Sequence, residues 1–102
     1  MATFLYRLSP PRPTFPADIT PDEGAAMQQH FAYWGQQMAA GRVLVVGPVA
    51  DPDGTYGIAV LNADSHAAAT SICAADPVIA GALGFTWHLY EMPGALVRDG
   101  DS

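Results

Sequence analysis

Apolar and polar residues alternate along the first stretch of the chain, other short stretches are apolar and β-branched runs, and two longer stretches have helical spacing instead. Alternation with a period of two is typical of strands, whereas apolar residues three and four positions apart indicate a helix. The pattern predicts strands at Ala2–Leu8, Val43–Val46, Tyr56–Leu61 and Thr86–Glu91. It predicts helices from Thr20 to about Ala40 and from Ser65 to Ala75.

The first predicted helix has a well-marked beginning and one apolar stripe. Thr20 suits the N-cap, Pro21 suits the first helical position, and Glu23 completes a capping box. The spacing predicts a buried stripe formed by Met27, Phe31, Trp34 and Met38. His30 is expected beside this stripe, one turn before Trp34.

The order of the predicted elements is βαββαβ, which predicts a ferredoxin-like α+β sandwich with an antiparallel sheet and both helices on one face. The other sheet face then has no cover, although the segments VLVV and YGIAVL are apolar on both faces. We therefore expect a homodimer that packs sheet to sheet as a dimeric α+β barrel. The chain is expected to be a single domain over residues 1–102, with a core at about 2–91 and a flexible tail at 92–102.

Composition supports an oligomer and argues against two classes of partner. The 102 residues are 50% apolar and only 14% charged, and the formal net charge is −6 with four arginines and no lysine. Such an acidic chain lacks the basic surface that nucleic acids and anionic membranes require, so neither is an expected partner. With no secretory start, no spanning apolar run and a lone Cys73, we expect a cytoplasmic protein.

Two connecting segments carry turn-forming residues. The segment Ser9–Ile19 contains four prolines, which exclude a helix or a central strand, so it is predicted to be a long loop. The segment Asp51–Gly54 is predicted to be the turn of a hairpin.

The candidate catalytic residues are His30, in the first predicted helix, and Asp76, after the second. An imidazole titrates near neutral pH, and a carboxylate can orient and stabilise it, so the pair would be capable of acid–base chemistry. The carboxylates of Asp51 and Asp53 are rivals to Asp76 as the partner of His30. Alternatively, His30 is a half-buried packing residue and Asp76 satisfies backbone donors in a turn.

A small-molecule site is expected near His30. Trp34 and Phe15 are predicted to bound a pocket there, and Arg7 and Arg12 are predicted to anchor an anionic group. Core packing explains the aromatic residues equally well, and the arginines have an alternative role as solvated surface residues.

Other site types find little support in the sequence. The histidines His30, His66 and His88 lack close metal-ligand spacing, and no serine, threonine or cysteine lies in a nucleophile motif. Gly47 and Pro48 follow a strand but open no helix, which argues against a dinucleotide site. No metal and no cofactor are expected.

The chain resembles the YciI-like (YCII-related) family in the order of several short motifs. These are a helix with HFAYW, a glycine followed by a short strand that ends in GP, and DP before the last strand. The resemblance covers about Phe4 to Tyr90. It implies a small dimeric α+β barrel with a ferredoxin-like protomer, and it implies a candidate catalytic dyad of His30 and Asp76.

The expected function is cofactor-free acid–base chemistry on a small organic molecule, with an elimination, isomerisation or lyase-type outcome. His30 would take a proton from the substrate, and Asp76 would orient the imidazole. One alternative is a noncatalytic ligand-binding or regulatory module on the same fold. Another is a cofactorless monooxygenase-like protein.

Overall fold

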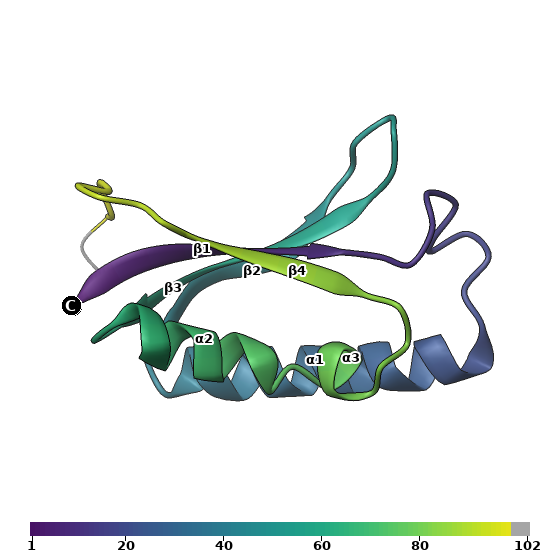
Figure 1. Cartoon of the computed structure of the whole chain (residues 1–102), viewed down its shortest axis with the longest axis horizontal. Coiled ribbons are helices and arrows are strands. Elements are labelled where there is room, and N and C mark those ends of the chain that lie inside the picture. Colours follow the sequence, from purple (N-terminus) through teal and green to yellow (C-terminus); the bar gives the residue numbers. More distant parts are fainter. Residues whose placement is uncertain (99–102) are drawn as a thin grey trace.

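The computed structural model describes residues 1–98, which form a four-stranded antiparallel sheet and three helices (Figure 1). In chain order these are β1 (Ala2–Ser9), α1 (Pro21–Ala39), β2 (Val43–Val49), β3 (Tyr56–Ala63), α2 (His66–Ala74), α3 (Pro77–Ala80) and β4 (Thr86–Glu91). The strand order β2-β3-β1-β4 puts β1 and β3 in the centre of the sheet. The ferredoxin-like α+β fold predicted from the element order is confirmed.

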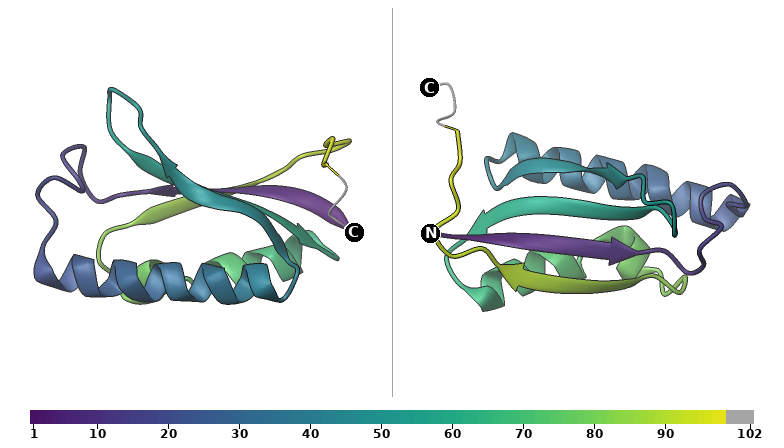
Figure 2. Two further views of the ribbon diagram at one scale, coloured as in Figure 1. Left: turned by 180° about the vertical axis from the view of Figure 1, so that it is seen from behind. Right: turned by 90° about the horizontal axis from the view of Figure 1, so that it is seen from above.

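The helices of residues 1–98 lie on one face of the sheet, and no helix of this part of the chain covers the other face (Figures 1 and 2). Strand β1 shows how the residues divide between the faces. Phe4, Tyr6 and Leu8 are buried in the core beneath the helices, whereas Leu5 and Arg7 alternate with them and point to the open face. The core therefore lies between the sheet and the helices.

Helix α1 begins as the sequence predicts but buries a different stripe. The Thr20 side chain accepts from the Glu23 backbone N–H, and the Glu23 carboxylate accepts from the Thr20 backbone N–H. The predicted stripe is wrong in part: Phe31 and Met38 are exposed. The stripe that faces the core consists of Glu23, Met27, His30 and Trp34. Polar side chains occupy two of these positions because each has hydrogen-bonding partners inside the fold.

Strand β2 is longer than predicted, because it continues through Gly47 and Pro48 to Val49. Proline removes one backbone donor, which is tolerated at a sheet edge, and β2 is an edge strand of the sheet formed by residues 1–98. A register shift between Val43 and Val45 marks a bulge against β3.

The chain between α2 and β4 forms a short helix that the sequence pattern did not predict. Asp76 is the N-cap of α3, and its carboxylate accepts from the Val78 backbone N–H at 3.1 Å. Pro77 takes the first helical position, where its missing N–H costs nothing. This cap points the Asp76 carboxylate into the core, where the residue is fully buried.

The last described residues have little regular structure. Residues 92–98 contain one turn at Pro93–Gly94 and neither helix nor strand. The rest of the predicted tail, residues 99–102, lies outside the described residues. No helix in the described part of the chain has both the length and the hydropathy needed to span a membrane.

Candidate functional site

Helices α1 and α3 bring His30 and Asp76 into direct contact. The imidazole Nδ1 of His30 lies 2.9 Å from Asp76 Oδ1 and 2.8 Å from Asp76 Oδ2. His30 is 6% exposed and Asp76 is 0% exposed. A neutral imidazole would donate its Nδ1–H to this carboxylate, which fixes the tautomer and leaves the Nε2 lone pair for other chemistry.

Three further groups donate hydrogen bonds to the buried Asp76 carboxylate. The Tyr6 hydroxyl donates to Oδ2 at 2.9 Å, the Trp34 indole Nε1 donates to the same oxygen at 2.7 Å, and the Val78 backbone N–H donates to Oδ1. These donors come from β1, α1 and α3, so the carboxylate joins three elements of the fold. A buried charge is tolerated when it is hydrogen-bonded in this way.

The donors keep Asp76 ionised despite its burial. Burial by itself would raise the pKa of Asp76, but hydrogen bonds from His30, Trp34 and Val78 together outweigh burial and hold the pKa below its ordinary value. Burial and the neighbouring Asp76 charge both raise the pKa of Tyr6, so its hydroxyl stays protonated and remains a donor. The carboxylate is therefore an acceptor for all four groups around it.

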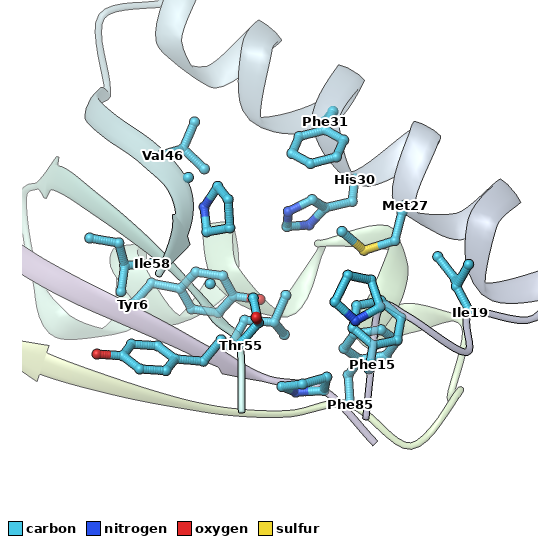
Figure 3. Close-up of a pocket in the computed structure, with 17 residues that line it drawn as sticks. Tyr6, Phe15, Ile19, Met27, His30, Phe31, Val46, Thr55, Ile58 and Phe85 are labelled. Carbon is cyan, nitrogen blue, oxygen red and sulfur yellow. The ribbon is translucent and has the colours of Figure 1, made fainter. Parts of the chain in front are cut away.

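The second ring nitrogen of His30 is accessible from a cavity. Nε2 makes no hydrogen bond to any described residue, yet every fully buried side-chain nitrogen and oxygen in the described chain has a partner. Nε2 must therefore have exposed surface, and His30 lines a cavity of about 280 Å³. Figure 3 shows the ring directed from α1 into this cavity, beside Phe31 and Met27.

The cavity is formed by α1, the sheet and the loop between β1 and α1. Its side chains are mainly aromatic and aliphatic, and among the described residues that line it none is aspartate, glutamate, lysine or arginine. Its aromatic lining residues are Tyr6, Phe15, Phe31, Tyr56 and Phe85. Phe31 and Ile19 are the lining residues with large exposed apolar side chains, which indicates that they lie near the mouth.

Comparison with known families agrees with this architecture. The family model of the YCII-related domain matches residues 5–92, which is most of the chain. The chain belongs to the YCII-related family. The resemblance inferred from the short motifs is thereby confirmed. A comparison with proteins of curated function finds no match.

In this YCII-related chain, Phe15 lies at the cavity and Trp34 does not. Phe15 is buried and packs edge-to-face on Phe85, with 5.4 Å between the ring centroids. The prediction that Trp34 bounds the pocket is corrected: Trp34 is fully buried and its indole contacts Asp76 instead. Trp34 lies one turn beyond His30 on α1, and its indole supports the carboxylate through this hydrogen bond.

Arg12 is engaged by carboxylates of the chain itself and does not line the cavity. Its guanidinium donates to both Glu23 oxygens at 2.7 Å and to one Asp18 carboxylate oxygen at 2.9 Å. A further bond to the Asp18 backbone carbonyl occupies more of its donors. The predicted role of Arg12 as an anion anchor is therefore corrected: it fastens the proline-rich loop to the beginning of α1.

The other predicted polar candidates also lie away from the cavity. Arg7 points to the open face of the sheet, where its guanidinium lies 4.0 Å from the centre of the Tyr56 ring. Asp51 and Asp53 lie in the hairpin turn, where the Asp51 carboxylate accepts from the Asp53 backbone N–H. Asp76 is therefore the carboxylate that contacts His30, and Arg7 is a surface residue on the sheet.

Cys73 and the other histidines are not part of the His30 site. Cys73 is fully buried in the core, and burial, together with the Asp76 charge, raises the pKa of its thiol to about 12. His66 packs against Phe4, and His88 stacks on Tyr90 on the open face. Among the described residues, no cluster of three histidine, cysteine or acidic side chains has the arrangement of a metal site.

Sequence reasoning missed Tyr6 as a partner of Asp76. The alternation of β1 put Tyr6 on the same face as Phe4 and Leu8, which indicates burial. A buried phenol hydroxyl requires a hydrogen-bonding partner, and this was the available signal. No equivalent signal pointed to the contribution of Phe85 to the cavity, because Phe85 precedes β4 in an irregular segment.

Proposed function

We propose that this protein catalyses proton transfer on a small, largely apolar organic molecule, with His30 as the general base and Asp76 as the residue that positions it. The observation that carries the proposal is the environment of the His30 ring. Its Nδ1 is bound to a buried carboxylate, and its unpartnered Nε2 belongs to a cavity-lining side chain. A base needs this combination of a fixed ring and an accessible lone pair.

The proposed step begins with a bound carbon or oxygen acid beside Nε2. The substrate C–H or O–H bond breaks, its proton moves to Nε2, and its electron pair stays on the substrate. His30 then carries a positive charge, which the Asp76 carboxylate stabilises across the 2.8 Å contact. Return of the proton to another atom gives an isomerisation, whereas loss of a leaving group gives an elimination.

The carboxylate is well suited to this positioning role. Tyr6, Trp34 and the Val78 N–H hold it in place, so the imidazole meets a prearranged negative charge. Prearranged charges need little reorganisation when the imidazolium forms, which makes them effective in a site with little water. These three donors also leave Asp76 without freedom to turn away from His30.

Hydrogen–deuterium exchange tests the proposal without knowledge of the natural product. Small uncharged ketones such as phenylacetone would be incubated with the protein in D2O, and loss of the α-proton signal would be followed by NMR. We expect the wild type to accelerate exchange, and His30→Asn to lower that rate by about 10²- to 10⁴-fold. The asparagine amide can still donate to Asp76 from the place of Nδ1, but it supplies no base at the place of Nε2.

The matched control is His66→Asn, because His66 is an exposed histidine outside the cavity. This variant should exchange the ketone at the wild-type rate. Equal rates in wild type and His30→Asn would show that His30 is not the base. Binding of the ketones by wild type without any exchange would favour the alternative of a noncatalytic ligand-binding module.

A further inference from the structure

The charge distribution around the cavity restricts which ligands it can take. None of the described lining residues is lysine or arginine, and the guanidinium of the nearby Arg12 donates its hydrogen bonds to Glu23 and Asp18. The negative charge of Asp76 lies one imidazole ring away from the cavity. The Arg7 guanidinium packs over the ring of the lining residue Tyr56 on the open face of the sheet, and Arg7 itself does not line the cavity. A ligand that carried a carboxylate would lose its hydration here without meeting a free cation.

Protonated His30 is the one cation that such an anion would meet among the described lining residues. Its charge would already be balanced by Asp76, which lies 2.8 Å from Nδ1. The site is therefore better matched to a ligand that arrives uncharged and gives up a proton.

The lining side chains favour an aromatic body with few polar groups. Aromatic rings contribute to several walls, including those of Phe15, Phe31 and Phe85 (Figure 3). Such rings pack well against another ring in edge-to-face or offset geometry. The Tyr6 hydroxyl is already bound to Asp76, so the polar side chains that remain for a ligand are those of His30, Thr55 and Tyr56. His30 is the one among them that is held by a buried carboxylate.

We propose that the cavity binds an uncharged aromatic molecule with one hydrogen-bonding group directed to His30 Nε2, and that it rejects the corresponding carboxylates. This inference names the class of ligand. It rests on the proposed function in one respect, which is that the ligand binds at the same His30 site. It separates this protein from binding proteins that recognise small acids through an arginine or a lysine.

Two probes of nearly the same shape test the inference. Titration calorimetry would compare 4-methylbenzamide, which is uncharged, with 4-methylbenzoate, which is an anion at pH 7.5. We expect the amide to bind at least about tenfold more tightly, because the carboxylate loses hydration without a compensating cation. Binding of the benzoate that equals or exceeds that of the amide would overturn the proposal, and so would failure of the amide to bind.

A charge-introducing variant shows whether the probes occupy this cavity. Ile19 lines the cavity and is 40% exposed, so Ile19→Arg adds a cation without burying it. We expect this variant to strengthen binding of the benzoate several-fold and to narrow the preference for the amide. The control is Met38→Arg, which makes the same charge change at an exposed position of α1 that does not line the cavity. An equal effect of both variants would contradict binding at this site.

The experiment also separates the two proposals from each other. Preference for the amide in both wild type and His30→Asn, together with no ketone exchange, would support the ligand class and reject the proton-transfer function. Ketone exchange that depends on His30, together with tighter binding of the benzoate, would support the proton-transfer function and reject the ligand class.

Discussion

The Trp34 indole donates a 2.7 Å hydrogen bond to the Asp76 carboxylate, and both residues are fully buried although they lie 42 positions apart. Trp34 follows His30 by one turn on α1, so a single helix supplies two of the groups that surround the carboxylate. The charge of Asp76 is therefore held by oriented donors, without any lysine or arginine. This arrangement leaves the negative charge available to His30.

Replacing Trp34 by phenylalanine should remove the indole hydrogen bond to Asp76 while leaving an aromatic ring in place. Trp34→Phe removes one donor from a buried charge and shortens a buried side chain, so we expect a loss of about 2–4 kcal/mol in the free energy of unfolding. It should also raise the pKa of Asp76, because a hydrogen bond to the ionised form is lost. Urea denaturation and carboxyl NMR would measure the two effects.

The control for Trp34→Phe is Trp87→Phe on β4. Trp87 is half-buried and packs on the Tyr6 ring, with 5.8 Å between the ring centroids, but it makes no hydrogen bond to Asp76. This variant should lower stability through lost packing and leave the pKa of Asp76 in place. An unchanged pKa of Asp76 in Trp34→Phe would contradict the role given to the indole.

The Asp76 carboxylate should matter for catalysis through its effect on His30. Asp76→Asn removes the charge that stabilises the imidazolium and can present the wrong hydrogen-bonding partner to Nδ1. We expect ketone exchange to fall by about 10²- to 10⁴-fold, measured per folded molecule after a check by circular dichroism. Asp51→Asn, in the hairpin turn, should leave exchange unchanged. The opposite pattern would make Asp51 the functional carboxylate.

The features that sequence analysis predicted correctly depend on local signals. The capping box of Thr20 and Glu23 marks the beginning of α1, and alternation marks β1, since both are properties of neighbouring residues. The approach of His30 to Asp76 followed from the element order, which places α1 and the segment after α2 on one face. The family resemblance supplied the reason to consider these two residues together.

The features that it missed depend on contacts between distant elements. The extent of β2 through Pro48 was underestimated because the sequence does not reveal which strand lies at the sheet edge. Arg12 was taken as an anion anchor because its ion pairs with Asp18 and Glu23 form only when the loop folds onto α1. Trp34 was placed at the cavity because apolar spacing alone does not distinguish a lining residue from one behind it.

The ion pairs of the proline-rich loop should make stability depend on acid. Hydrogen bonds from Arg12 lower the pKa of Glu23 from 4.5 to about 2. A carboxyl whose pKa is lowered by folding stabilises the protein above its unfolded pKa, and this contribution is lost as the pH falls through the folded value. We therefore expect the contribution of Glu23 to disappear between about pH 4.5 and about pH 2. Asp76 contributes with the same sign, because its hydrogen bonds outweigh its burial and hold its pKa below the ordinary value.

Glu23→Gln tests this acid dependence directly. The variant cannot lose a charge on acidification, so its denaturation midpoint should change less between pH 7 and pH 3 than that of the wild type. Asp22→Asn is the control, because Asp22 is the exposed neighbour in the same first turn of α1. If Asp22→Asn flattens the pH profile as much as Glu23→Gln does, the ion pair with Arg12 does not contribute in the expected way.

An apolar row of side chains crosses the open face of the sheet. Leu5 on β1 pairs with Val60 on β3 and with Tyr90 on β4, and Val60 pairs with Val45 on β2. Val45 is 52% exposed and Tyr90 is 49% exposed. A row of this kind across all the strands of residues 1–98 is costly to leave in water. We propose that a second copy of the chain covers it, sheet against sheet.

A charge placed in this row should separate the two copies. Val45→Glu puts a carboxylate at the edge-strand end of the row, where a symmetric partner would have to bury it, so we expect a shift from dimer to monomer. Light scattering after size-exclusion chromatography would measure the mass of each species. Met38→Glu is the control, because Met38 has similar exposure but lies on α1, on the other side of the sheet. A wild-type monomer, or a dimer that survives Val45→Glu but not Met38→Glu, would show that the sheet face is not the interface.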